Sequence, residues 1–136
     1  MMYEDLLAKF SENPHLTIYN KQSSLFMGSF IVDFYYKDKI NMQFLNDRGI
    51  VEVSLVVPSV FSLNAIPLKF VVDFVQGIQS PNSKYIFSNV LEGYEFFMNN
   101  MQILDKIIEN KMLKKINRKW GQPRPNRDNR TNHTVL

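Results

Sequence analysis

Hydrophobic and polar residues alternate over much of the first half of the chain, with the period of two that is typical of β-strands. From Phe26 to Lys37, bulky apolar residues at the even positions alternate with a mixed set at the odd positions. The alternation recurs over 40–45 and over 50–55, and 15–20 forms a shorter predicted strand. Because short polar turns connect these four segments, they predict an antiparallel meander.

Apolar residues at helical spacings of three and four lie in three further segments. The first, 3–10, ends before Asn13-Pro14, because a residue that precedes proline avoids the α region. The second begins near Pro67 and ends at Gly77, after Pro58 has ended the fourth strand and 61–63 has formed a loop or a single turn.

The third helical segment begins at Ser88 or Asn89, and its periodicity continues to about Arg118. A helix of this length either breaks near Gly93 or extends beyond the sheet, and its outer half is then available for a homodimer. The predicted fold is α+β: a four-stranded antiparallel meander with a short N-terminal helix and two C-terminal helices, the last one long. We expect one domain over 1–120 and a basic, disordered tail over 121–136.

Charge is distributed unevenly along the 136 residues. Residues 1–110 contain 8 Lys/Arg and 12 Asp/Glu, a net charge of −4, whereas 111–136 contain 8 Lys/Arg and one Asp, a net charge of +7. The formal net charge of +3 therefore combines an acidic globule with a basic C-terminal segment.

Several kinds of chemistry find no support in the sequence. The chain has no cysteine, which removes disulfides and thiolate metal sites, and its five glycines form no phosphate-binding motif. His15 precedes a strand and His133 lies in the tail, so neither converges with other reactive groups. Asp33 and Glu52 are a candidate carboxylate pair on neighbouring strands, but we expect them instead to be solvated acids on a wet sheet face. We therefore expect no enzyme, no metal and no cofactor.

The N-terminus lacks the basic and apolar regions of a secretory signal, and no apolar run approaches the length of a membrane span. These features predict a soluble, cytoplasmic protein without a membrane partner.

The short stretch Asn46-Asp47-Arg48-Gly49 carries the charged pair that first suggests a site. Asn and Asp initiate turns through their own backbone, and glycine supplies the positive φ that closes a hairpin. Three interpretations stay open: an exposed turn with a local ion pair, an Arg48 side chain that folds back onto backbone carbonyls, and an Arg48 that belongs to a binding surface.

The basic C-terminal segment, 111–130, is the clearest electrostatic feature. A basic helix end is favoured by the helix dipole alone, and basic tails are often simply solvated. The functional alternative is an arm that neutralises phosphates, in which Trp120 stacks on a base. The candidate nucleic-acid contacts are Lys114, Lys115, Arg118, Lys119, Trp120 and Arg124.

The odd-numbered side of the predicted sheet offers a second candidate surface. If helices cover only the other side, Ile31, Tyr35, Leu45 and Ile50 form an exposed apolar patch with charged residues around it. Such a patch marks a protein partner. The alternative is that the N-terminal or the long C-terminal helix covers it.

The element order over 3–77, with its "hydrophobic run, D-R-G, hydrophobic run" at Asp47-Arg48-Gly49, resembles small bacterial immunity-like or uncharacterised proteins encoded near toxins. The resemblance implies a protein that binds and neutralises another protein, possessing no catalytic residue. An acidic body suits a basic toxin domain, because complementary charge speeds encounter. The candidate interface residues are Asp33, Tyr35, Asp38, Asp47, Arg48 and Glu52, and a nucleic-acid-binding adaptor is the alternative function.

Overall fold

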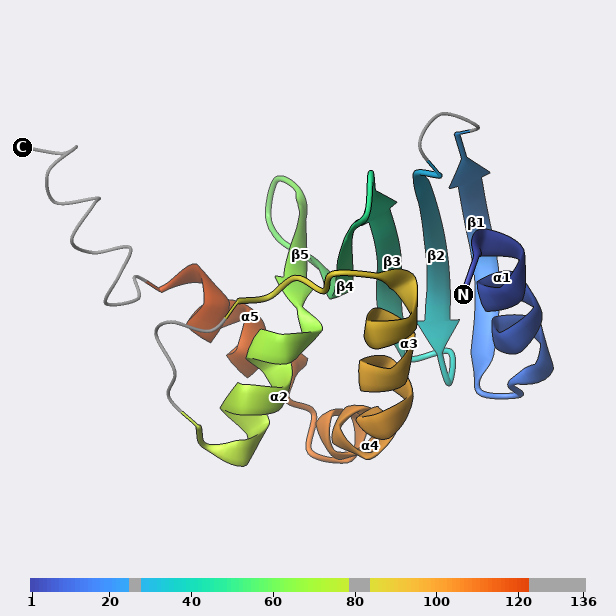
Figure 1. Ribbon diagram of the computed structural model, residues 1–136. Helices are drawn as coiled ribbons and strands as arrows, with labels where there is room; N and C mark the ends of the chain where they lie inside the picture. The colour runs from blue at the N-terminus through green and yellow to red at the C-terminus, as the bar shows by residue number, and fades with distance from the viewer. Residues whose placement is uncertain (25–27, 79–83, 123–136) are drawn as a thin grey trace, which may run out of the picture.

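The chain folds into an α+β structure in which a five-stranded antiparallel sheet, ordered β1-β2-β3-β4-β5, is combined with five helices (Figure 1). The computed structural model describes residues 1–24, 28–78 and 84–122, and these counts concern those residues. The strands are β1 (Leu16–Ser23), β2 (Phe30–Tyr36), β3 (Ile40–Asp47), β4 (Ile50–Pro58) and β5 (Leu63–Pro67). The helices are α1 (Tyr3–Glu12), α2 (Leu68–Gln76), α3 (Val90–Asn99), α4 (Met101–Glu109) and α5 (Leu113–Gly121).

The prediction of four strands is wrong, because a fifth strand, β5, pairs with the end of β4. The sequence pattern predicts a loop or a single turn over 61–63 and a helix that begins near Pro67, where β5 is observed. A strand this short shows no readable alternation, and Pro67 is tolerated because β5 lies at the edge of the sheet. β2 also begins later than predicted, at Phe30, and the predicted start at 26–27 lies outside the described residues.

The single long C-terminal helix is also wrong, since three shorter helices occupy 90–121. The first break is at Asn100, whose side-chain amide bonds the Phe96 carbonyl at 2.8 Å. The second lies before α5, where Lys111 adopts a positive φ of 52°. Neither break is at Gly93. The homodimer predicted from the sequence relied on the outer half of one long helix. The described residues contain three short helices in its place.

The described helices lie on one face of the sheet and bury its bulky side chains. Figure 1 shows α1 in front of β1 and α3 in front of β3, with α4 below α3, and α3 also contacts β4. α2 and α5 pack on β4 and β5. Asn64 shows that α5 lies on the same face of the sheet as the other helices. It lies opposite buried Val57, so its side chain points to the helix side, where it donates a hydrogen bond to Asn117 of α5 at 2.9 Å. The largest fully buried sheet side chains are Phe34, Tyr36, Ile40, Met42, Phe44, Leu55 and Ile66.

A small polar cluster attaches α4 to the turn between β2 and β3. Asp105 of α4 accepts a hydrogen bond from the Tyr36 hydroxyl at 2.7 Å and forms an ion pair with Lys37 at 2.8 Å. Lys37, and then Tyr36, hold the pKa of Asp105 below its ordinary value. Burial, and then the bond to Asp105, raise the pKa of the Tyr36 hydroxyl.

The lowered pKa of Asp105 makes a prediction about stability and pH. A carboxyl group whose pKa is lower in the folded state stabilises the fold above its unfolded pKa of about 3.9, and this stability is lost as pH falls through the folded pKa. Asp105→Asn should therefore lower the free energy of unfolding at pH 7 by at most about 1 kcal/mol, since the pair is partly exposed. Urea unfolding of both proteins tests this: the gap should close at strongly acidic pH. An equal gap at both pH values would contradict the assignment.

Candidate functional site

The candidate site is the sheet face opposite the helices, here called the open face. No helix in the described part of the chain packs on it, and Tyr19, Tyr35 and Ile50 are exposed there. Of the two alternatives derived from the sequence, the uncovered face is the one observed among these residues. Its side chains in β1–β4 are Thr17, Tyr19, Asn20, Gln22, Ile31, Asp33, Tyr35, Asn41, Gln43, Leu45, Asp47, Ile50, Glu52, Ser54 and Val56.

A β-bulge in β1 brings two neighbouring side chains to this face. The pairing of β1 with β2 shifts register between Ile18 and Asn20. Tyr19 then stacks on Tyr35 with ring centroids 4.6 Å apart, and its hydroxyl donates to Asn41 Oδ1 at 2.7 Å. A bulge re-aims a side chain in this way without ending the strand. The result is an aromatic pair across β1 and β2 that a hydrogen bond ties to β3.

Beside this pair, Asp33 is held by two side-chain amides. Asn20 Nδ2 donates to one carboxylate oxygen at 2.7 Å, and Gln43 Nε2 donates to the other at 3.0 Å. Both donors are neutral amides, so they orient the carboxylate without forming an ion pair with it. The arrangement displays a charge on a rigid surface.

Asp33 and Glu52 are not brought together. Asp33 pairs with Gln43, which in turn pairs with Ser54, so Glu52 lies two strands away and two residues further along. Two strand spacings alone are about 10 Å, beyond the separation of a paired catalytic site. Among the described residues, no group of three His, Asp or Glu side chains could hold a metal ion.

The Asp47-Arg48 pair forms the tip of the β3–β4 hairpin. Arg48 and Gly49 both have positive φ, 53° and 93°, as a two-residue hairpin turn requires. Arg48 Nε contacts Asp47 Oδ1 at 3.1 Å, and the Asn46 side chain accepts from the Gly49 amide at 2.9 Å. The observed contact is that of the first interpretation, an exposed turn with a local ion pair. Membership of a binding surface stays a prediction.

The other predicted interface residues are spread around the sheet. Tyr35, Asp33, Glu52 and Asp47 lie on the open face, whereas Asp38 lies in the β2–β3 turn. The strand positions of this face contain three acids and no lysine or arginine. The open face is therefore acidic as well as partly apolar.

The basic residues are gathered elsewhere, on and beside α5. Lys114, Lys115, Arg118 and Lys119 are all exposed on this helix. The Trp120 ring packs edge-on against Phe70 at 4.9 Å and Tyr85 at 5.6 Å, which gives it a structural role. Arg124 and the rest of the predicted tail, apart from Gly121 and Gln122, lie outside the described residues. Nucleic-acid binding by this segment stays a prediction.

Sequence reasoning missed the polar half of the open face: Tyr19, Asn20, Asn41 and Gln43. The amides at 41 and 43 are readable as outward-facing strand positions. Tyr19 and Asn20 are not, because strict alternation places adjacent residues on opposite faces, and only the bulge brings them together.

The site is assigned from the residues of this chain alone. No helix among residues 1–24, 28–78 and 84–122 is long and apolar enough to span a bilayer. Comparison with family models, curated proteins and solved structures finds no match.

Proposed function

We propose that this chain is a non-enzymatic protein-binding module that binds a basic protein on its open face. An immunity-like role, in which the chain binds and neutralises a toxin, is the biological form of this proposal. The observation that carries it is the sheet face that the described helices leave uncovered, with a stacked tyrosine pair and an oriented carboxylate on β1 and β2.

The composition of the open face supports protein recognition. Tyrosine supplies a large, amphipathic contact area at a low cost in conformational entropy, and amides supply adaptable hydrogen bonds. Here Tyr19 and Tyr35 hold each other in place, and Asn20 and Gln43 hold Asp33. Side chains that are already ordered lose little further freedom on binding, so more of the contact energy appears as affinity.

The charge on the open face indicates the sign of the partner. Asp33 and Glu52 have no oppositely charged partner among the described residues. A bound protein with lysines or arginines at the contact supplies these opposite charges. The same charges steer that protein to the open face at long range. The association rate should therefore fall as salt rises.

Charge reversal on the open face tests the proposal with the protein encoded next to this chain as the first partner. Glu52→Arg should weaken the complex by about tenfold or more, because a favourable contact becomes repulsive. Tyr35→Ala should cost a similar factor as an aromatic anchor. Titration calorimetry measures both affinities.

The matched control is Glu95→Arg, which makes the same change at an exposed position of α3, within the helix layer. It should leave the affinity within about twofold, since rim and remote charges contribute little. The proposal fails if the neighbouring product forms no complex, or if Glu95→Arg and Glu52→Arg weaken binding equally.

A further inference from the structure

The loop between β4 and β5 presents apolar side chains to solvent. Val60 is 87 %, Phe61 97 % and Leu63 65 % exposed, and we call these three residues the apolar tip. Single exposed apolar residues are normal, but three together at one protruding loop are not. Leu63 lies opposite Pro58 and so on the open-face side of β5, but β5 is three strands away from Asp33 and Tyr35 in β2, so the tyrosine and carboxylate cluster does not include the apolar tip.

Hydrogen bonds hold the apolar tip in this exposed form. The Ser59 amide donates to the Ser62 carbonyl at 2.7 Å, and the Ser59 hydroxyl donates to the same oxygen at 2.9 Å. The two serine hydroxyls are also 3.2 Å apart. The loop is therefore closed at its base, while the two residues at its apex project outward. This arrangement preorganises an apolar wedge.

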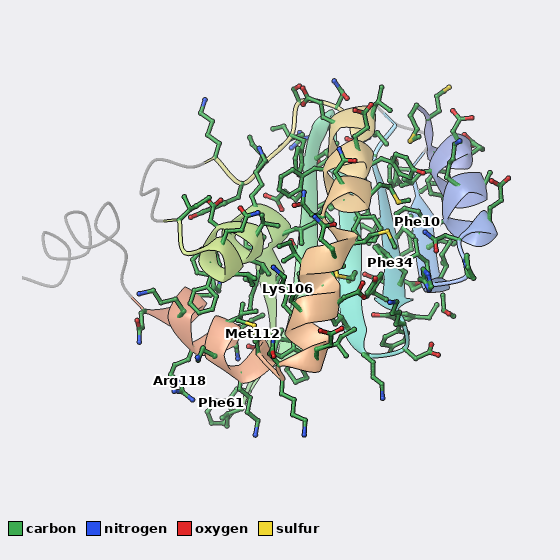
Figure 2. The ribbon with its side chains drawn as sticks, turned by 90° about the horizontal axis from the view of Figure 1, so that it is seen from below. Phe10, Phe34, Phe61, Lys106, Met112 and Arg118 are labelled. Carbon is green, nitrogen blue, oxygen red and sulfur yellow. The ribbon has the colours of Figure 1, made fainter. Side chains whose placement is uncertain are left out.

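The basic helix α5 packs on β5, the strand that directly follows the loop of the apolar tip. Asn64, the residue after the tip, bonds Asn117, the residue before Arg118. Seen from below, Phe61 and Arg118 lie at the same edge of the molecule (Figure 2), and Figure 1 shows that the β4–β5 loop projects above α5 along this edge. Within the described part of the chain, the cations of this region form no ion pair. They are Lys111, Lys114, Lys115, Arg118 and Lys119.

We propose that the apolar tip and α5 together dock this protein on the surface of an anionic membrane. A bilayer interface accepts a convex apolar wedge without a matching pocket, and apolar side chains enter it to a depth of about 5–10 Å. Cations beside the wedge are attracted by anionic headgroups. The sequence predicts no membrane partner because no segment is long enough to span a bilayer. The contact proposed here is of a different kind, in which the protein binds the membrane surface without crossing it.

The apolar tip favours a membrane over a nucleic acid as the ligand of α5. Phe61 offers one exposed ring for stacking, but Val60 and Leu63 have no aromatic face, and the Trp120 ring already packs against two aromatic neighbours. A protein partner would need a pocket shaped to a protruding loop, whereas lipid does not.

Vesicle sedimentation of the full chain tests the proposal. Vesicles of phosphatidylcholine with about 30 mol % phosphatidylserine should bind the protein, and phosphatidylcholine alone should bind it at least about tenfold less. The double substitution Val60→Ser, Phe61→Ser should reduce binding by about tenfold or more, because the inserted apolar area is lost. Lys114→Glu with Arg118→Glu should do the same and should remove most of the salt dependence.

The matched control is Ile50→Ser, which removes an exposed apolar side chain at the other end of β4, on the open face. It should leave vesicle binding unchanged. Equal losses for Ile50→Ser and the double serine variant would overturn the proposal, as would binding that ignores phosphatidylserine. The proposal would also be overturned, in favour of a nucleic acid, if the protein bound a single-stranded oligonucleotide more tightly than it bound vesicles. That binding would have to depend on Lys114 and Arg118 and not on Phe61. Glu52→Arg changes the open face and leaves the apolar tip and α5 unchanged. Failure of the protein-binding proposal can therefore be distinguished from failure of the membrane proposal.

Discussion

Phe10→Ala is expected to lower the free energy of unfolding by about 3–5 kcal/mol, the range for deleting a fully buried phenylalanine. Phe10 is 1 % exposed and anchors α1 to the rest of the core. Its ring centroid lies 4.7 Å from that of Phe34 in β2 (Figure 2). It lies 5.8 Å from the ring of Phe97 and 6.2 Å from the rings of both Phe44 and Tyr94. Truncation removes one partner from four aromatic contacts at once. Since domains of this kind are stable by about 5–15 kcal/mol, much of the stability should be lost.

The control for Phe10→Ala is the same substitution at the most exposed phenylalanine. Phe61 is 97 % exposed, so Phe61→Ala should change the free energy of unfolding by less than about 0.5 kcal/mol. Urea denaturation followed by circular dichroism measures both variants. Similar costs for the two substitutions would show that α1 does not pack on the sheet as described.

Gly93→Val is expected to cost about 2–3 kcal/mol through overpacking. A Cβ atom at Gly93 would lie 2.8 Å from Val51 Cγ1 and 3.1 Å from Phe44 Cζ. Both neighbours are fully buried, so neither side chain moves aside into solvent. The glycine in α3 therefore allows the helix to approach β4 closely, although glycine normally weakens a helix. Thermal or urea unfolding gives the loss of stability directly.

Two further variants separate overpacking from a general effect of valine in a helix. Gly121→Val introduces the same side chain at the end of α5, where no atom lies within 4 Å of the added Cβ, and it should cost far less. Val51→Ala removes the atom that clashes, so the Gly93→Val cost in that background should fall by at least about 1 kcal/mol. Strictly additive costs would rule out the contact as the cause.

The sequence predicted those elements whose pattern reports burial on one side. β2, β3 and most of β4 alternate because one face meets the helices and the other does not, and α2 ends at Gly77 with the positive φ expected of a helix stop. β5 escaped prediction because five residues are too few to show a period.

The helix breaks were invisible for a physical reason. Phe97, Leu104 and Ile116 are all fully buried, so the apolar spacing continues across Asn100 and across the turn before α5. Three short helices that bend to follow one sheet need the same spacing as one straight helix. Periodicity records which side chains are buried and does not record a change in helix direction.

The candidate site was predicted in part. Asp33, Tyr35 and Glu52 follow from alternation once one face is known to be open, but the side on which the helices pack is a tertiary fact. The bulge at Tyr19 and the hydrogen bonds to Asp33 depend on register, which the sequence does not encode in a readable way. The pattern predicts a loop at 61–63, but it does not indicate that the side chains of the apolar tip are exposed.

The central claim is that this protein recognises another protein through the open face of its sheet. An amide chemical-shift map, recorded while the partner is added, tests it most directly. The account predicts that the largest changes fall on Asp33, Tyr35, Gln43 and Glu52, with little change in α3 and α4. Changes confined to the helix layer, with the open-face strands unaffected by a bound partner, would contradict it.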